Sequence, residues 1–149
     1  MRADPTPARL RVAALALRDS AILLAKHRKN ERLSFLLPGG GVENGESVKA
    51  ALARELREEA RVECVVGALR YVIEVQAPAL SRHIVQFVFE TKLSGDVGPS
   101  RDPRVLECAW HPIEELAGLR MHPDVGALLA SDLRAGRRAP RYVLARWRA

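Results

Sequence analysis

The segment from Gly39 to Val62 constrains this chain more than any other, because it joins a glycine-rich stretch to a helix with a fixed pattern of charges. Ser47 is placed to cap the helix, and the run from there to Ala60 is rich in Ala, Leu, Arg and Glu, which favour helix. At about 100° per residue, one face of this run is apolar; its members are Val48, Leu52, Leu56 and Ala60. The sequence therefore predicts an amphipathic helix that ends near Ala60.

Three glutamates of the predicted helix, Glu55, Glu58 and Glu59, stand at relative positions i, i+3 and i+4. We expect their carboxylates to converge on one face, where like charges repel one another. Arg54 can pair with Glu58 or reach back to Glu46, but one guanidinium cannot neutralise three carboxylates. Hard oxygen ligands on a rigid element suit Mg²⁺ or Mn²⁺, which share their coordination shell with substrate phosphates. The pattern thus predicts a bound divalent cation.

The stretch from Pro38 to Gly41 is expected to form a turn ahead of this helix. Glycines let the backbone adopt positive φ and approach a ligand closely, so such a turn can aim a carbonyl at a metal or amides at a phosphate. A glycine turn or a glutamate-rich helix is common when it occurs alone. The two together, at this spacing, indicate a site for a metal ion and a phosphorylated ligand.

Counted from Gly40, the order is glycine, five residues, Glu46, seven residues, Arg54-Glu55-Leu56, one residue, Glu58-Glu59, one residue, and Arg61-Val62. This pattern resembles the Nudix box. The resemblance implies a metal-dependent hydrolase that cleaves the pyrophosphate bond of a nucleoside diphosphate linked to another moiety. It implies catalytic roles for Glu58, Glu55 and Arg54, metal ligation by Glu55, Glu58, Glu59 and the carbonyl of Gly39, and orienting roles for Glu46 and Gly40. The general base stays open between a box glutamate and a later carboxylate; the candidates outside the helix are Glu43, Asp96, Asp102 and Glu107.

One position departs from the box. Arg61 stands where the family usually has the glycine that ends the helix. If arginine kept the left-handed conformation that glycine serves there, it would cost on the order of 1 kcal/mol. The departure puts the geometry of this turn in question more than the chemistry.

The substrate is less constrained. Pro78 lies sixteen residues beyond Val62 and resembles a proline found downstream of the box in ADP-ribose hydrolases, although it could simply begin a turn between strands. We take Arg28, Pro78 and His83 as candidate substrate-binding residues, and favour ADP-ribose or a nucleotide sugar. The alternatives are a nucleoside triphosphate pyrophosphohydrolase and a non-catalytic nucleotide-binding module, and the retained glutamates argue against the latter.

The rest of the chain predicts an α+β fold. Expected strands cover residues 10–17 and 21–26, paired as a hairpin closed near Asp19-Ser20, and residues 63–75, 82–93, 107–110 and 142–147. A second helix is expected over residues 125–133, with Gly136 as its stop. Together with the resemblance, this predicts a Nudix-like α/β/α sandwich with a mixed sheet, and a single domain over residues 1–149.

Composition and charge limit the classes of binding partner that we expect. The 149 residues carry a net charge of +6, but the arginines are scattered and aromatic residues are few, so we expect a small phosphorylated nucleotide and no polynucleotide. A homodimer is left open. Cys64 and Cys108 match neither a CxxC motif nor a zinc spacing, which suggests reduced core thiols. Because no signal peptide or membrane span is evident, we expect a cytoplasmic location.

Overall fold

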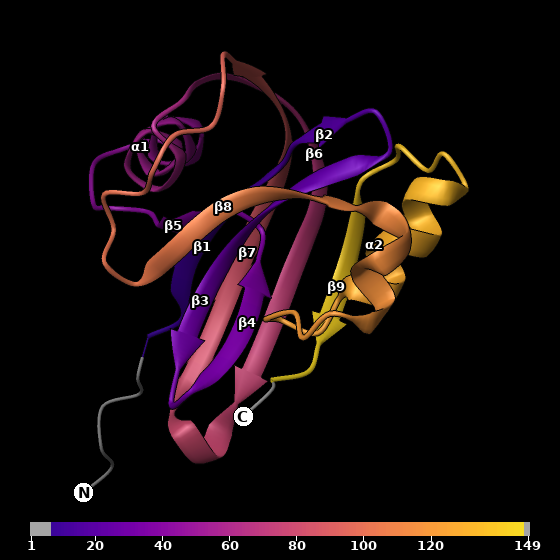
Figure 1. The fold of residues 1–149 in the computed structure, drawn as a ribbon. Helices are drawn as coiled ribbons and strands as arrows, with labels where there is room; N and C mark the ends of the chain where they lie inside the picture. Colours follow the sequence, from indigo (N-terminus) through magenta and orange to yellow (C-terminus); the bar gives the residue numbers. More distant parts are fainter. Residues whose placement is uncertain (1–6, 148–149) are drawn as a thin grey trace, which may run out of the picture.

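The computed structural model of the protein describes residues 7–147 (Figure 1). Its larger sheet has the strand order β5 (Gly39–Gly41), β1 (Arg9–Leu15), β7 (Arg82–Ser94), β6 (Glu63–Ala77), β9 (Arg141–Ala145). In the second sheet, β3 (Ala21–Lys29) pairs with β2 (Leu17–Arg18), β4 (Arg32–Leu36) and β8 (Val105–Pro112). The helices are α1 (Val48–Ala60) and α2 (Gly126–Arg134), with 3₁₀ turns η1 (Pro78–Leu80) and η2 (Ile113–Gly118). Parallel pairs (β1 with β7, β6 with β9) stand beside antiparallel ones, so the expected mixed sheet and α+β class are confirmed.

Other elements pack on both faces of the larger sheet. Figure 1 shows α1 on one face, and the second sheet and α2 on the other. On the α1 side, Leu52, Leu56 and Ala60 of the predicted stripe are fully buried against strand residues such as Val12 and Phe89. A second core joins the larger sheet to β3, η2 and α2. This packing places α1 against β1.

The predicted hairpin between residues 10–17 and 21–26 is wrong in its main pairing. β1 lies in the larger sheet, antiparallel to β5 and parallel to β7, and only the two residues of β2 pair with β3. The physical reason is the continuous burial of Val12 to Ala16, none of which exceeds 2% exposure. A continuous apolar run is typical of a central strand covered on both faces, whereas a surface hairpin would alternate. The turn at Asp19 is found where expected, with φ 54°.

The stretch expected as a turn before α1 is instead the short strand β5. Gly39, Gly40 and Gly41 pair with Ala13, Val12 and Arg11 of β1. A Cβ atom on Gly39 would lie 2.0 Å from the carbonyl oxygen of Val12. Gly39 is therefore needed for close approach, and none of the three glycines has positive φ.

The helix predictions hold. The Ser47 hydroxyl accepts a hydrogen bond from the amide of Ala50 at 3.1 Å and caps α1. α2 spans Gly126–Arg134, and Gly136 follows it with φ 69°. The later strands match the predicted ones to within a few residues. Among residues 7–147, no helix is long and apolar enough to cross a membrane.

Candidate active site

Arg54 is the centre of the polar network on α1. Its guanidinium donates to Glu46 at 2.7 and 3.2 Å, to Glu55 at 3.0 Å and to the carbonyl oxygen of Gly41 at 3.0 Å. A longer contact of 3.5 Å reaches Glu58. Glu46 also accepts from the amide of Glu43 at 2.8 Å. Arg54 therefore ties the loop before α1 to the end of β5 and fixes the side chain of Glu55.

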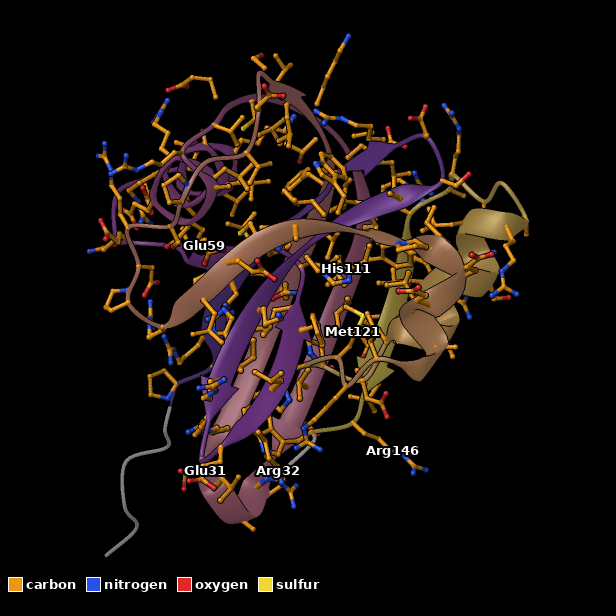
Figure 2. All side chains as sticks on the ribbon, viewed as in Figure 1. Glu31, Arg32, Glu59, His111, Met121 and Arg146 are labelled. Carbon is orange, nitrogen blue, oxygen red and sulfur yellow. The ribbon has the colours of Figure 1, made fainter. Side chains whose placement is uncertain are left out.

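Glu59 and Glu55 face β5. The amide of Gly39 donates to a carboxylate oxygen of Glu59 at 3.2 Å, so Glu59 lies between α1 and β5 (Figure 2). A Cβ atom on Gly40 would lie 2.4 Å from the carboxylate carbon of Glu55. Both carboxylates are thus seated against the strand, and only glycine leaves room for that of Glu55.

Burial makes this acidic pair unfavourable when both members are charged. Glu59 is 4% exposed, and burial, reinforced by the charge of Glu55, raises its pKa to about 8. Burial also raises the pKa of Glu55, against the opposing hydrogen bond from Arg54. A cation beside these two carboxylates would relieve both costs.

The expected three-way convergence of carboxylates is incomplete. In residues 7–147 no group of three or more His, Cys, Asp or Glu side chains is arranged to hold a metal ion. Glu55 and Glu59 come together, whereas Glu58 is about half exposed and contacts Arg54. The donor chemistry of the pair nevertheless fits Mg²⁺ or Mn²⁺, because its hard oxygens are buried and Glu59 has no ion pair in the described chain.

Sequence reasoning missed a set of cations beside this pair. Burial lowers the pKa of Arg11 on β1, and the charges of Glu59 and Glu55 oppose that shift. Arg104, in the loop before β8, also interacts with both carboxylates, although its hydrogen bond to Asp102 is the larger cause of its raised pKa. A signal was present in the sequence. Arg11 shares one strand face with buried Ala13, where a charge is unusual.

His27 extends this set toward the second sheet. Burial lowers its pKa, with Asp102, Arg104 and Arg11 as the neighbouring charges. The carboxylate of Asp102 is 9% exposed and accepts from Arg104 at 2.8 and 3.1 Å. The charge of Asp102 also raises the pKa of Glu59. Among the candidates outside α1, Asp102 is therefore the one that interacts electrostatically with the acidic pair.

The other candidates for a general base outside α1 stand apart from the acidic pair. Glu107 is paired with Lys26 at 3.0 Å. Glu43 is largely exposed and lies 3.9 Å from Arg54. Asp96 is exposed in the loop after β7.

The predicted substrate-binding residues are not brought into the acidic cluster. Pro78 begins η1 at the turn between β6 and β7, at the opposite end of the ribbon from α1 (Figure 1). His83, at the start of β7, has its Nε2 atom 2.5 Å from Glu74, which also accepts from Tyr142. Arg28 is exposed near the end of β3. The simple interpretation of Pro78 as the start of a turn describes its position in the structure.

Comparison with known proteins places this geometry in a family. The NUDIX domain family matches residues 7–131. The chain belongs to the NUDIX family. A NUDIX hydrolase structure from Nitrosomonas europaea superposes with a TM-score of 0.78 over 90% of this chain and 93% of that one, at 22% identity.

Two curated relatives are more similar in sequence. The human 8-oxo-dGDP phosphatase NUDT18 is 32% identical over 91% of this chain and 45% of its own length. The NAD-capped RNA hydrolase NudC of Escherichia coli is 34% identical over 77% of this chain and 43% of its own. The chain therefore spans less than half the length of these relatives.

Arg61 occupies the left-handed turn in which NUDIX sequences usually place glycine. Its φ and ψ are 50° and 44°, and its amide donates to the carbonyl of Arg57 at 3.1 Å, ending α1. The turn geometry of the box is therefore kept despite the substitution, with the strain that a side chain brings to this region.

Arg61→Gly is expected to raise the free energy of unfolding by up to about 1 kcal/mol, because glycine adopts this conformation without steric cost. Turnover should stay nearly unchanged, since Arg61 is exposed and has no contact with the acidic pair. Urea unfolding and steady-state kinetics check both parts. A clear loss of activity would show that the Arg61 guanidinium supports the reaction.

Proposed function

We propose that the chain is a divalent-cation-dependent hydrolase that cleaves the pyrophosphate bond of a nucleoside diphosphate linked to another group. One observation carries this proposal. The buried carboxylates of Glu55 and Glu59 on α1 are seated against β5, within electrostatic reach of Arg11 and Arg104. A diphosphate can be held by the arginines on one side, while a cation joins it to the carboxylates on the other.

The residues divide the chemistry among them. Glu55 and Glu59 would hold the cation, and the more exposed Glu58 would be a further ligand or the base that takes the proton of water. Arg54 and Glu46 keep Glu55 in place, and Gly39 and Gly40 leave the space in which the carboxylates rest. When bound, the cation activates water and neutralises charge on the departing oxygen. Water attacks one phosphorus, the bridging P–O bond breaks, and the proton of water passes to a carboxylate.

The preferred substrate class is a nucleoside diphosphate joined to a sugar, with ADP-ribose as its first test. By their names, the two relatives act on a nucleoside diphosphate and on NAD-capped RNA. Both substrates carry a nucleoside next to a pyrophosphate linkage, which supports this class. The proposal rests on the acidic pair and its arginines, and does not require Pro78 to contact the substrate.

The deciding experiment is a substrate panel with product analysis. ADP-ribose, nucleotide sugars, nucleoside diphosphates, dinucleoside polyphosphates and nucleoside triphosphates are each incubated with Mg²⁺ or Mn²⁺ and with excess EDTA, and the products are separated by chromatography. We expect AMP and ribose 5-phosphate from ADP-ribose, and no turnover in EDTA. Pyrophosphate from a triphosphate, with ADP-ribose untouched, would replace the preferred class. Binding without hydrolysis of any compound would favour the non-catalytic module.

Arg11→Gln should raise KM for the best substrate at least about tenfold and change kcat much less, because a charge-assisted hydrogen bond to phosphate is lost. Arg138→Gln removes the same charge from an exposed position and serves as the matched control. Equal KM values in the two variants would contradict a phosphate-binding role for Arg11. Arg28→Gln and His83→Gln, measured in the same assay, decide whether these predicted residues contact the substrate.

A further inference from the structure

A second concentration of positive charge lies at the C-terminal end of α1. A cavity of about 210 Å³ there is lined by Arg57, Arg61, Val62, Glu63 and Arg101. We call it the arginine pocket. It is lined neither by the acidic pair nor by Arg11, Arg104 or His27.

Backbone hydrogen bonds hold the walls of the arginine pocket together. The amide of Gly98 donates to the carbonyl of Ala60 at 2.7 Å, and the amide of Arg101 donates to that of Glu58 at 2.7 Å. The loop before β8 is therefore fixed to the last turn of α1. A Cβ atom on Gly98 would lie 3.1 Å from the Cβ of Arg61, so the loop packs closely on the left-handed turn. Arg61 and Arg101 are thus presented by anchored backbone.

The charges of the arginine pocket are not balanced internally. Arg57 donates to both carboxylate oxygens of Glu63, at 2.8 and 3.1 Å. Within residues 7–147, the guanidiniums of Arg61 and Arg101 have no hydrogen bond or ion pair to another side chain. Three arginines and one glutamate leave two positive charges, which match a phosphate dianion.

One effect opposes an anion at this place. The C-terminal end of a helix carries a partial negative charge on its free carbonyl groups. Here the carbonyls of Arg57, Glu58 and Ala60 each accept a backbone hydrogen bond, from Arg61, Arg101 and Gly98 respectively. This satisfies much of the negative end of α1, and the two unpaired guanidiniums outweigh what is left.

We propose that the arginine pocket binds a phosphate group, at a site separate from the one where hydrolysis takes place. Its volume falls below the 300 Å³ or so at which pockets begin to enclose whole drug-sized ligands, so a single phosphate or a diphosphate suits it better than a complete nucleotide. The phosphate can be free in solution or belong to a phosphodiester chain. The proposal is independent of the proposed hydrolysis, because it requires neither the cation nor turnover.

The test is a binding titration of the full chain in EDTA, with the backbone amide chemical shifts measured by NMR as the readout. Inorganic phosphate is the probe in one arm and a short single-stranded oligonucleotide in the other. Arg61→Gly is the informative variant, because its fold is expected to become more stable while the guanidinium is lost. Arg101→Gln is the second variant. Arg138→Gln controls for charge, and Arg11→Gln excludes binding beside the acidic pair.

We expect Arg61→Gly and Arg101→Gln to weaken binding at the arginine pocket, measured from the shifts of its own amides, at least about tenfold in one or both arms. Arg138→Gln and Arg11→Gln should leave the affinity measured from these pocket amides unchanged. Shifts in the wild type should include Arg61, Val62 and the loop residues near Arg101. An effect confined to the phosphate arm identifies free phosphate, and one confined to the oligonucleotide arm identifies a phosphodiester chain. Equal affinity of wild type and both pocket variants in both arms, or no binding of either probe, would overturn the proposal.

Discussion

Glu58→Gln is expected to lower kcat at least about a hundredfold at saturating Mg²⁺ or Mn²⁺, as the loss of a metal-ligating or proton-transfer group usually does. The free energy of unfolding should change little. Glu58 is about half exposed, and its contact with Arg54 at 3.5 Å is of the kind that contributes at most about 1 kcal/mol at a surface. The expected signature is therefore lost turnover in a stably folded protein.

Steady-state kinetics on ADP-ribose and thermal unfolding of the same preparation measure the two quantities. Glu115→Gln is the matched control, because it removes one exposed carboxylate far along the chain, in η2. Undiminished turnover in Glu58→Gln would remove Glu58 from the reaction. A comparable loss in the control would show that net charge, and not position, sets the rate.

The features of the site that could be predicted from the sequence are those fixed by local structure. The cap at Ser47 and the spacing of Glu55 and Glu59 follow from helix geometry alone, and the structure places both glutamates on one buried face. The hydrogen bonds from Arg54 to Glu46 could likewise be predicted, because both residues lie in one continuous segment. Short-range contacts of this kind leave a periodic signal in the sequence.

The features of the site that could not be predicted from the sequence depend on pairing between distant segments. The apolar run that follows Arg11 favours a central strand but does not identify β5 and β7 as its neighbours, so Arg11 could not be assigned to the surroundings of Glu59. The same holds for Arg104, which reaches the site through the loop before β8. The hairpin prediction was wrong because strands adjacent in the sequence were assumed to pair with each other. The continuous apolar run of β1 favours a central position in a sheet.

The glycines show how a correct residue can have a different physical role. Gly39 and Gly40 were expected to supply unusual backbone angles, and the structure uses them for lack of a side chain. Val12 approaches Gly39, and the carboxylate of Glu55 approaches Gly40. Both interpretations predict intolerance to substitution, so the sequence alone could not separate them.

Glu59 provides the second large effect, on stability. Burial and the charge of Glu55 raise its pKa from 4.5 to about 8 in the folded protein. The folded state therefore keeps a proton that the unfolded chain releases above pH 4.5 or so. The resulting stabilisation is fully present below the unfolded pKa and is lost as pH rises through about 8.

In EDTA, the free energy of unfolding should fall between pH 5 and 8.5 in both proteins, and by roughly 3 kcal/mol more in the wild type than in Glu59→Gln. This figure is smaller than the full value of about 1.4 kcal/mol per pKa unit, because water penetration and relaxation reduce the cost of the buried charge. The variant has a neutral amide at this position, so the difference between the two curves isolates Glu59 and its interaction with Glu55 from the other titrating groups. Urea unfolding across this pH range measures it. Mg²⁺ or Mn²⁺ should restore wild-type stability at pH 8.5 and leave the variant largely unaffected, because a cation binds the ionised carboxylates of the native state. Parallel curves for the two proteins would mean that Glu59 is ionised in the folded state well below pH 8, and that the acidic pair needs no cation to stay charged.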